Sequence, residues 1–402
     1  MLYVTSKPLG AWFRYSGDME SGSPLDRTFL TLLMCAALWI LFRRKFDWLG
    51  AIKENVWLIV LIVFMLVSVS WSDIPYISFK RWTREFQAIV IAFVILSERS
   101  PHQAIEAILR RTAYILIPFS LILIKYFPEY GVSYGRYGGG RMWVGVALQK
   151  NSLGHLCLIS AFFLVWSLVR ERQRHNPRVS KYQTPLAIFL IAMTLVLMGG
   201  PGWKSYSATS IVALAVGLLV YWRISSLKKR GTHWTASTLV AIVAALIVFG
   251  IFILFAGGSS IEFIASAAGR DATLTGRTGI WAVLLPIAMQ KPFMGRGFGS
   301  YWTTTTTKLA PHAHNGYLDL LLGLGFVGIV LVSMFLLSSC RKAHQTLMAN
   351  FDWGTLWICY LIMLLICNIT ESSMNSFTRP LTALILFLTV SSANVFSARN
   401  QS

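Results

Sequence analysis

Long apolar runs separated by short polar segments recur along the whole chain, which is the pattern of a protein that crosses a membrane many times. A spanning helix needs about 20 predominantly apolar residues to cross roughly 30 Å of hydrocarbon. Several runs are shorter than this, and their flanks must complete the span. The eleven predicted spans lie near residues 28–42, 56–71, 85–97, 113–127, 152–169, 184–199, 208–222, 235–256, 316–339, 354–369 and 380–396. The pattern therefore predicts an all-α integral membrane protein.

These spans divide the chain into four parts. Residues 1–24 form a polar exterior tail without the apolar region of a cleavable signal peptide, and residues 25–256 carry the first eight helices. Residues 257–315 form the one long loop, and residues 316–402 carry the last three helices and a cytoplasmic tail. A loop of this length is more often functional than idle. We therefore expect the chemistry in the segment 257–315.

The composition excludes several classes of protein. Hydrophobic residues make up 55% of the chain and charged residues 13%, about half the charged share of a soluble domain. A soluble enzyme, a disordered tail protein and a fibrous repeat are thereby excluded. The net charge of +20 would suggest nucleic acid in a soluble protein, but in this apolar background it indicates either membrane orientation or an anionic ligand.

The basic residues also predict the orientation. The loops that follow alternate spans hold 19 of the 36 Lys and Arg residues, and 12 of the others lie outside the long loop. Because short cytoplasmic loops are enriched in Lys and Arg, we expect the N-terminus outside and the C-terminus inside. The exterior loops still hold many cations that topology does not require, among them Arg136, Arg141, Lys150 and Arg296. A rim beside anionic headgroups would explain each one singly, and a lipid diphosphate would explain them together.

Three features stand out in the long loop. Gly276 to Trp281 precedes an apolar run that can form an interfacial amphipathic helix, which Pro286 would kink or end. Residues 291–299 form a glycine-rich turn whose backbone N–H groups could approach a phosphate. A dinucleotide fold is rejected, because no predicted strand precedes this turn. Residues 311–318 lead directly into a spanning helix and contain His312 and His314.

A histidine at such a helix entrance has two readings. It either packs at the interface or acts as a general base beside a lipid-linked substrate. No third or fourth metal ligand is evident near His312 and His314, so we expect neither a metal nor another cofactor. Asp18 and Glu20 are the nearest approach to a metal-binding acidic pair, and we interpret them as solvated.

Three motifs of this loop, in this order and spacing, resemble those of a known family. They are Leu274 to Trp281, the turn with Pro292 and Gly295-Arg296-Gly297, and His312-Ala313-His314-Asn315-Gly316-Tyr317-Leu318. The set resembles the periplasmic loop of the O-antigen ligase and Wzy-type polysaccharide polymerase superfamily. Secondary matches are Gln149 to Gly154 and Ser205 to Ser210, so the resemblance covers roughly residues 60–390. Such proteins usually have about a dozen spans, which implies eleven or twelve here.

The resemblance implies a GT-C-like glycosyltransferase of the bacterial inner membrane that works on the periplasmic face. Its donor would be a glycan on undecaprenyl diphosphate, its acceptor another glycan or lipid A-core, and the transfer would invert the anomeric centre without metal. Breaking a glycosyl–diphosphate bond builds charge that fixed arginines can stabilise.

The expected site residues follow from these roles. Arg277 stabilises the leaving diphosphate and His314 is the base, while His312 orients or replaces His314. Glu371 orients a donor sugar or pairs with an exterior Arg. The other expected diphosphate contacts are Arg136 or Arg141 as a second clamp, Lys150 and Arg296.

Two other classes of function remain open. A transporter or flippase of an anionic lipid-linked glycan would also have many spans, but it predicts inverted repeats and charged helix interiors. A non-catalytic partner of other polysaccharide-assembly proteins would tolerate loss of Arg277 and His314. Within the enzyme reading, polymerase, ligase and protein oligosaccharyltransferase share the donor chemistry, and overall resemblance slightly favours the polymerase.

Overall fold

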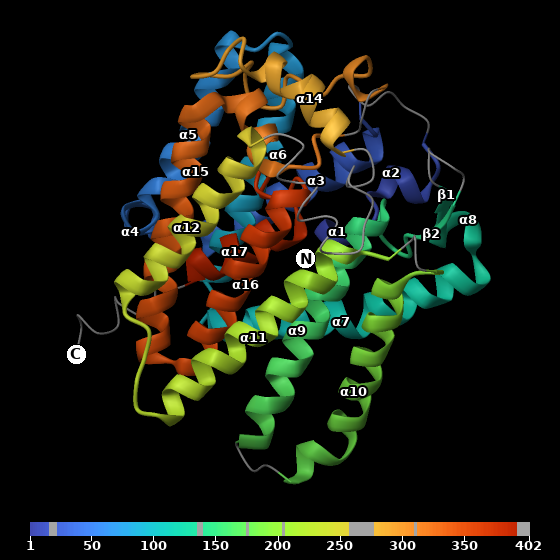
Figure 1. The fold of residues 1–402 in the computed structure, drawn as a ribbon, viewed down its shortest axis with the longest axis vertical. Coiled ribbons are helices and arrows are strands. Elements are labelled where there is room, and N and C mark those ends of the chain that lie inside the picture. Colours follow the sequence, from blue (N-terminus) through green and yellow to red (C-terminus); the bar gives the residue numbers. More distant parts are fainter. Residues whose placement is uncertain are drawn as a thin grey trace.

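The chain forms a bundle of helices with one small β-hairpin (Figure 1). The computed structural model describes residues 1–15, 22–134, 140–173, 177–202, 206–256, 277–308 and 312–391. The elements in chain order are α1 (Leu2–Thr5), α2 (Leu9–Trp12), α3 (Pro24–Arg43), α4 (Trp48–Glu54), α5 (Val56–Val67), η1 (Ser68–Trp71), α6 (Pro75–Leu96), α7 (Pro101–Tyr126), α8 (Pro128–Gly131), β1 (Val132–Tyr134), β2 (Arg141–Trp143), α9 (Lys150–Gln173), α10 (Pro177–Gly199), α11 (Ala208–Lys229), α12 (Ala236–Phe255), α14 (Arg277–Ala288), η3 (Thr306–Lys308), α15 (Gly316–Ala349), α16 (Phe351–Thr370) and α17 (Pro380–Ser391).

Seven of the described helices are long and apolar enough to cross a membrane, namely α3, α7, α9, α11, α12, α15 and α16. The pair formed by α4 and the helical segment Val56–Trp71, bent by 94°, would make eight. The predicted third span falls within α6, whose 22 residues include Lys80, Arg81, Arg84 and Glu85 and are therefore more charged than an ordinary span. The all-α membrane class is confirmed, while the count of eleven spans stays a prediction.

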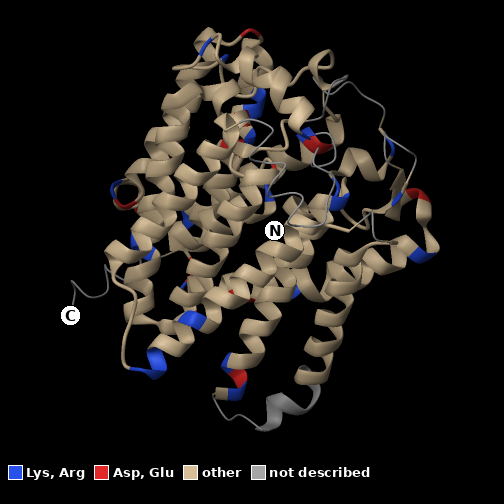
Figure 2. Cartoon of the chain, viewed as in Figure 1, with Lys and Arg blue, Asp and Glu red and all other residues tan. Residues whose placement is uncertain are grey.

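The charged ends of the helices agree with an alternating path through the membrane. The basic ends of α9 and α11 lie at the bottom of Figure 2, and α14 lies at the opposite end of the bundle in Figure 1. Most of the helical surface between the two ends lacks charge (Figure 2). Helix α14, in the described part of the segment 257–315, therefore lies at the end of the bundle opposite to the basic ends of α9 and α11.

The glycine-rich turn at residues 291–299 packs against a break in α15. Gly325 leaves the helical conformation, with φ 66° and ψ −164°. The N–H of Phe326 donates to the carbonyl of Pro292, and the N–H of Arg296 donates to the carbonyl of Leu322. The N–H of Phe298 donates to Ser68 Oγ. The expectation that these N–H groups approach a phosphate is thus wrong for Arg296 and Phe298, whose N–H groups hold the turn to α15 and η1.

Helix α14 is the amphipathic helix expected in the long loop. Its buried residues, Arg277, Trp281, Leu284 and Ala288, recur at helical spacing and form one face. The helix continues through Pro286 and ends two residues later. This geometry places Arg277 on the face of α14 that packs against the rest of the protein.

Candidate active site

The segment between His312 and Asn315 is fixed at the entrance of α15. Asn315 caps the helix, because its Oδ1 accepts from the N–H groups of Tyr317 at 2.9 Å and Leu318 at 3.1 Å. Trp281 of α14 donates its indole N–H to the carbonyl of Ala313 at 2.8 Å. His314 itself has φ of 53°, in the left-handed region that non-glycine residues seldom adopt. Backbone strain of this kind gathers at functional sites.

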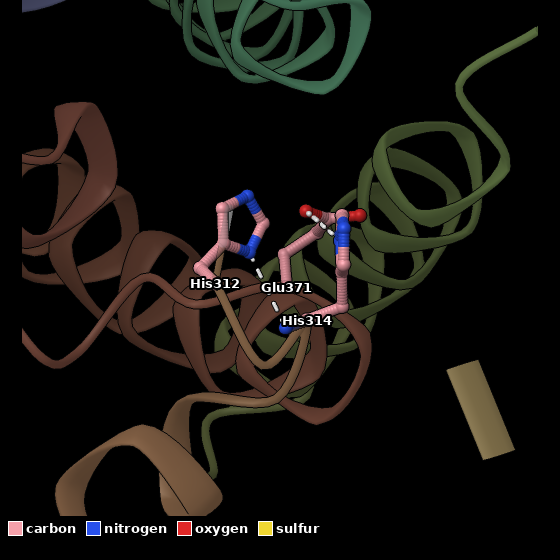
Figure 3. A group of neighbouring side chains, drawn as sticks. All are labelled: His312, His314 and Glu371. Atoms are coloured by element: carbon pink, nitrogen blue, oxygen red, sulfur yellow. Dashed lines mark hydrogen bonds and ion pairs between the residues drawn. The ribbon is translucent and has the colours of Figure 1, made fainter. Parts of the chain in front are cut away.

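Glu371 brings three distant parts of the chain together where α16 ends. Its Oε1 accepts from Arg277 Nη2 at 2.5 Å and from Asn151 Nδ2 at 2.6 Å. Its Oε2 lies 3.6 Å from Nδ1 of His314. Figure 3 shows Glu371 and His314 facing each other, with His312 beside them. An arginine, a histidine and a carboxylate thus form one cluster.

The negative charge of this cluster is the carboxylate of Glu371, which is paired with the guanidinium of Arg277. Glu371 is 4% exposed, and burial alone would raise its pKa. The opposing charge of Arg277, with smaller contributions from His314 and His312, outweighs burial and lowers the pKa of Glu371 to about 2. The carboxylate therefore stays ionised at physiological pH. Arg277 is 8% exposed, and within the described residues Glu371 contacts only its Nη2, so other guanidinium N–H groups can donate to another anion.

His312 is a neutral neighbour. Its Nδ1 accepts from the backbone N–H of His314 at 3.2 Å, and its Nε2 lies 3.4 Å from Gln149 Oε1. These partners assign the proton to Nε2. Burial, together with the charges of His314, Arg379 and Arg277, lowers the pKa of His312 to about 3. The acceptor nitrogen of His312 is thus occupied, and its contact with the backbone of His314 holds that residue.

Close packing of α9 against α11 supports the cluster. A Cβ on Gly154 of α9 would lie 2.2 Å from Ser207 Oγ and 2.6 Å from Ser210 Oγ, so glycine is required where α9 meets the start of α11. Thr209 of α11 shares a 2.7 Å hydrogen bond with Thr370, the residue before Glu371. The two secondary sequence motifs therefore meet beside the carboxylate.

The donor atoms of His312, His314 and Glu371 lie within 4.8 Å of one another, which metal ligands also require. The expectation that no third ligand lies near the two histidines is therefore wrong. The guanidinium of Arg277 on the same carboxylate opposes a divalent cation, and His312 Nδ1 is occupied by a backbone N–H. Metal-free chemistry stays a prediction.

The structure brings Arg277, His312, His314 and Glu371 together, and the other expected residues differ in where they lie. Arg296 pairs with Asp73 at 3.4 Å and donates to Gln290 Oε1 at 2.6 Å, so this geometry gives its expected diphosphate role no support. Arg141 lies exposed on β2, opposite Tyr134. Lys150 is the first residue of α9, beside Asn151. Arg136, Asp18 and Glu20 lie outside the described residues.

Gln149 and Asn151 are site residues that residue chemistry did not identify. Their signal was the motif Gln149 to Gly154, which precedes a span. The expected pairing of Glu371 with an arginine of another connection is present as the contact with Arg277, whereas its hydrogen bond with Asn151 joins residues 220 positions apart and has no local signature.

Comparison with known proteins agrees with the motifs. A family model described as O-antigen ligase (Wzy_C) matches residues 186–333, a region that contains Arg277, His312 and His314 but neither Asn151 nor Glu371. The exopolysaccharide production protein ExoQ of Rhizobium meliloti (strain 1021) is 23% identical over 319 residues. That alignment covers 72% of this chain and 66% of the relative, just under two thirds of its length. The resemblance to the O-antigen ligase and Wzy-type superfamily is thereby confirmed.

Proposed function

We propose that this protein is a membrane glycosyltransferase that transfers or polymerises undecaprenyl-diphosphate-linked oligosaccharides on the periplasmic face of the bacterial inner membrane. The observation that carries the proposal is the Arg277–Glu371–His314 cluster at the entrance of α15. It combines a fixed cation for a leaving diphosphate with a histidine for an acceptor hydroxyl. The exopolysaccharide relative supports the polymerase slightly over the ligase.

Arg277 would stabilise the charge that develops on the diphosphate as the glycosidic bond breaks. Glu371 holds one Nη of the guanidinium, which fixes its plane before the donor arrives. Preorganised donors of this kind commonly supply the largest part of transition-state stabilisation.

His314 would remove the proton from the attacking hydroxyl. Its Nδ1 faces Glu371, which leaves Nε2 to accept the proton. A base oriented by a carboxylate is a recurrent arrangement, and such contacts are often longer before substrate binds. His312 is the orienting residue rather than a replacement base, because its acceptor nitrogen is occupied. Attack opposite the leaving diphosphate would invert the anomeric centre.

The direct test is to incubate purified protein with an undecaprenyl-diphosphate oligosaccharide and separate the products by size. A ladder of glycan lengths identifies a polymerase, and a single transfer to added lipid A-core identifies a ligase. Absence of transfer to either acceptor, together with vesicle uptake of the lipid-linked glycan, would support the flippase instead.

The same assay tests the absence of a metal. Treatment with EDTA should leave the rate of transfer unchanged, because Arg277 would stabilise the negative charge of the leaving diphosphate without a metal ion. Loss of transfer that one divalent ion restores would contradict this and would assign His312, His314 and Glu371 to a metal.

A further inference from the structure

A cavity of about 760 Å³ reaches His312, while Arg277, His314 and Glu371 are not among its lining residues. Its volume is within the range of about 300–1,000 Å³ that is usual for ligand sites. Segments of α6, α15 and α17, the connection after α16 and residues near the N-terminus line it. A cavity that reaches a proposed catalytic segment is a candidate for the substrate.

Arg81, Arg84 and Arg379 give the cavity a cationic end and apolar residues predominate farther along α6 and α17, while Arg111 of α7 also lines it. On α6 the lining residues Arg81, Arg84, Ala88 and Ile91 change from cationic to apolar as the helix proceeds. The chain segment that enters α17 shows the same order, because Arg379 precedes the lining residues Ala383 and Phe387. From Pro380 to Phe387 the helix rises about 10 Å. Because α6 and α17 pack together, the change from cationic to apolar residues along each helix belongs to the same cavity.

Arg379 is the distinctive residue of the charged end. It is half-buried, and within the described part of the chain no hydrogen bond or ion pair engages its guanidinium. The two carboxylates that line the cavity are occupied by other donors. Glu85 accepts from Ser376 Oγ at 2.7 Å and from the N–H of Phe377 at 2.5 Å. Asp319 accepts from Trp302 Nε1 at 2.8 Å.

Two further observations connect this end of the cavity with the proposed reaction centre and with a ligand. The charge of Arg379 contributes to lowering the pKa of His312, so the guanidinium acts on the proposed reaction centre. Asn375 lines the same end, and its Oδ1 is buried without a partner among the described residues, so it can accept from a ligand hydroxyl.

We propose that this cavity binds the lipid part of a polyprenyl diphosphate, with Arg379 on the diphosphate and the first isoprene units between α6 and α17. The proposal rests on the proposed function, and it makes Arg379 the second clamp that the sequence assigned to Arg136 or Arg141. The ligand is the donor rather than the acceptor. In the donor the diphosphate adjoins the reacting carbon, whereas in a lipid-linked acceptor a sugar chain separates the two.

The test is equilibrium binding to the purified full chain in detergent, with farnesyl diphosphate and inorganic pyrophosphate as probes. The wild type should bind farnesyl diphosphate at least tenfold more tightly than pyrophosphate, because only the former fills the apolar end. Arg379→Gln should weaken both probes about tenfold or more. Ala88→Phe should weaken farnesyl diphosphate alone, because it fills the apolar end.

Lys125→Gln is the matched control, since it removes one exposed positive charge on α7 outside the cavity and should change binding less than twofold. Arg379→Lys keeps the charge and should retain part of the affinity, and melting temperatures check that each variant is folded. Unchanged binding in a folded Arg379→Gln would overturn the proposal. Displacement of farnesyl diphosphate by an equal concentration of phosphatidylglycerol would also overturn it, because the cavity would then be an ordinary lipid site.

The two proposals can fail separately. If Arg379→Gln weakens farnesyl diphosphate but the wild type transfers no glycan, the lipid-diphosphate site stands and the glycosyltransferase fails. If the wild type transfers glycan and Arg379→Gln leaves the donor KM unchanged, the cavity is not the donor site.

Discussion

At the scale of single residues, Glu371 links the two proposed chemical roles. The carboxylate is buried and contacts the guanidinium of Arg277 and the imidazole of His314 on different oxygens. Removing one partner of a buried ion pair typically costs about 3–5 kcal/mol, because the other charge stays buried and unpaired. The same carboxylate therefore fixes both side chains and holds them at one separation, which a transfer between two substrates requires.

Arg277→Lys should slow glycan transfer by about 10²–10³-fold, the usual effect of losing one preorganised donor. Lysine keeps the charge and can still pair with Glu371, but it lacks the planar fork that binds two phosphate oxygens. The measurement is the initial rate of transfer at equal amounts of folded protein in the membrane. A rate within threefold of the wild type would show that charge alone suffices and would remove the bidentate role.

His314→Gln should slow transfer by about 10²–10⁴-fold while leaving donor binding nearly intact, because the change removes a base and not a phosphate contact. Wild-type activity should fall on acidification, since the base must be neutral to accept a proton. The pKa of His312 is about 3 and that of Glu371 about 2, so neither group changes charge between pH 5 and 8. If His314 is the base, the acid limb should be absent from the residual activity of His314→Gln, and its persistence would assign the limb to another group, such as Glu85 in the cavity lining.

At the scale of elements, the site depends on how closely α15 approaches α16. A Cβ on Gly316 would lie 1.8 Å from Asn368 Oδ1, and that amide also accepts from the N–H of Met374 at 2.9 Å. Gly316→Ala should therefore lower stability by about 1–3 kcal/mol, as overpacking usually does, and should slow transfer by shifting the His314 segment. Melting temperature in detergent measures the first effect and the transfer rate the second.

Gly199→Ala is the matched control, because no atom lies within 4 Å of the added Cβ near the end of α10. It should leave both quantities nearly unchanged. A melting temperature for Gly316→Ala equal to that of the control would show that the two helices can separate without cost.

The sequence predicted elements better than it predicted contacts between them. Apolar runs identify α12 and α15, and the spacing of Trp281 and Leu284 identifies α14, because these signals are local. Glu371 could be proposed as the partner of some exterior arginine, but the choice of Arg277 depends on the fold. The expectation that the glycine-rich turn at residues 291–299 approaches a phosphate was wrong because the turn packs against the break at Gly325. That break has no sequence signature other than another glycine. In the sequence Arg379 is one of many cations in the predicted exterior loops, and only the packing of the helices shows that it lines a cavity.

At the scale of the whole molecule, the proposed chemistry requires an anionic ligand on one side of the membrane. The described cluster and cavity both use residues from connections that the Lys and Arg count assigns to the exterior, such as Asn151, Arg277, Glu371 and Arg379. The basic ends of α9 and α11 lie at the other end of the bundle (Figure 2). The basic ends of α9 and α11 are therefore distinct from Arg277 and Arg379, whereas Arg111, which the same count assigns to the cytoplasm, also lines the cavity.

Topology is therefore the prediction on which the periplasmic reaction depends. Thr305 is exposed within the segment 257–315, and Thr232 is exposed in the connection that follows Lys228 and Lys229 of α11. The background carries Cys35→Ser, because Cys35 is an exposed thiol and the other four cysteines are buried. In intact spheroplasts an impermeant thiol reagent should label Thr305→Cys, and it should label Thr232→Cys only after the membrane is opened. The reverse pattern would place Arg277 and His314 in the cytoplasm, and a periplasmic transfer by this cluster would then be impossible.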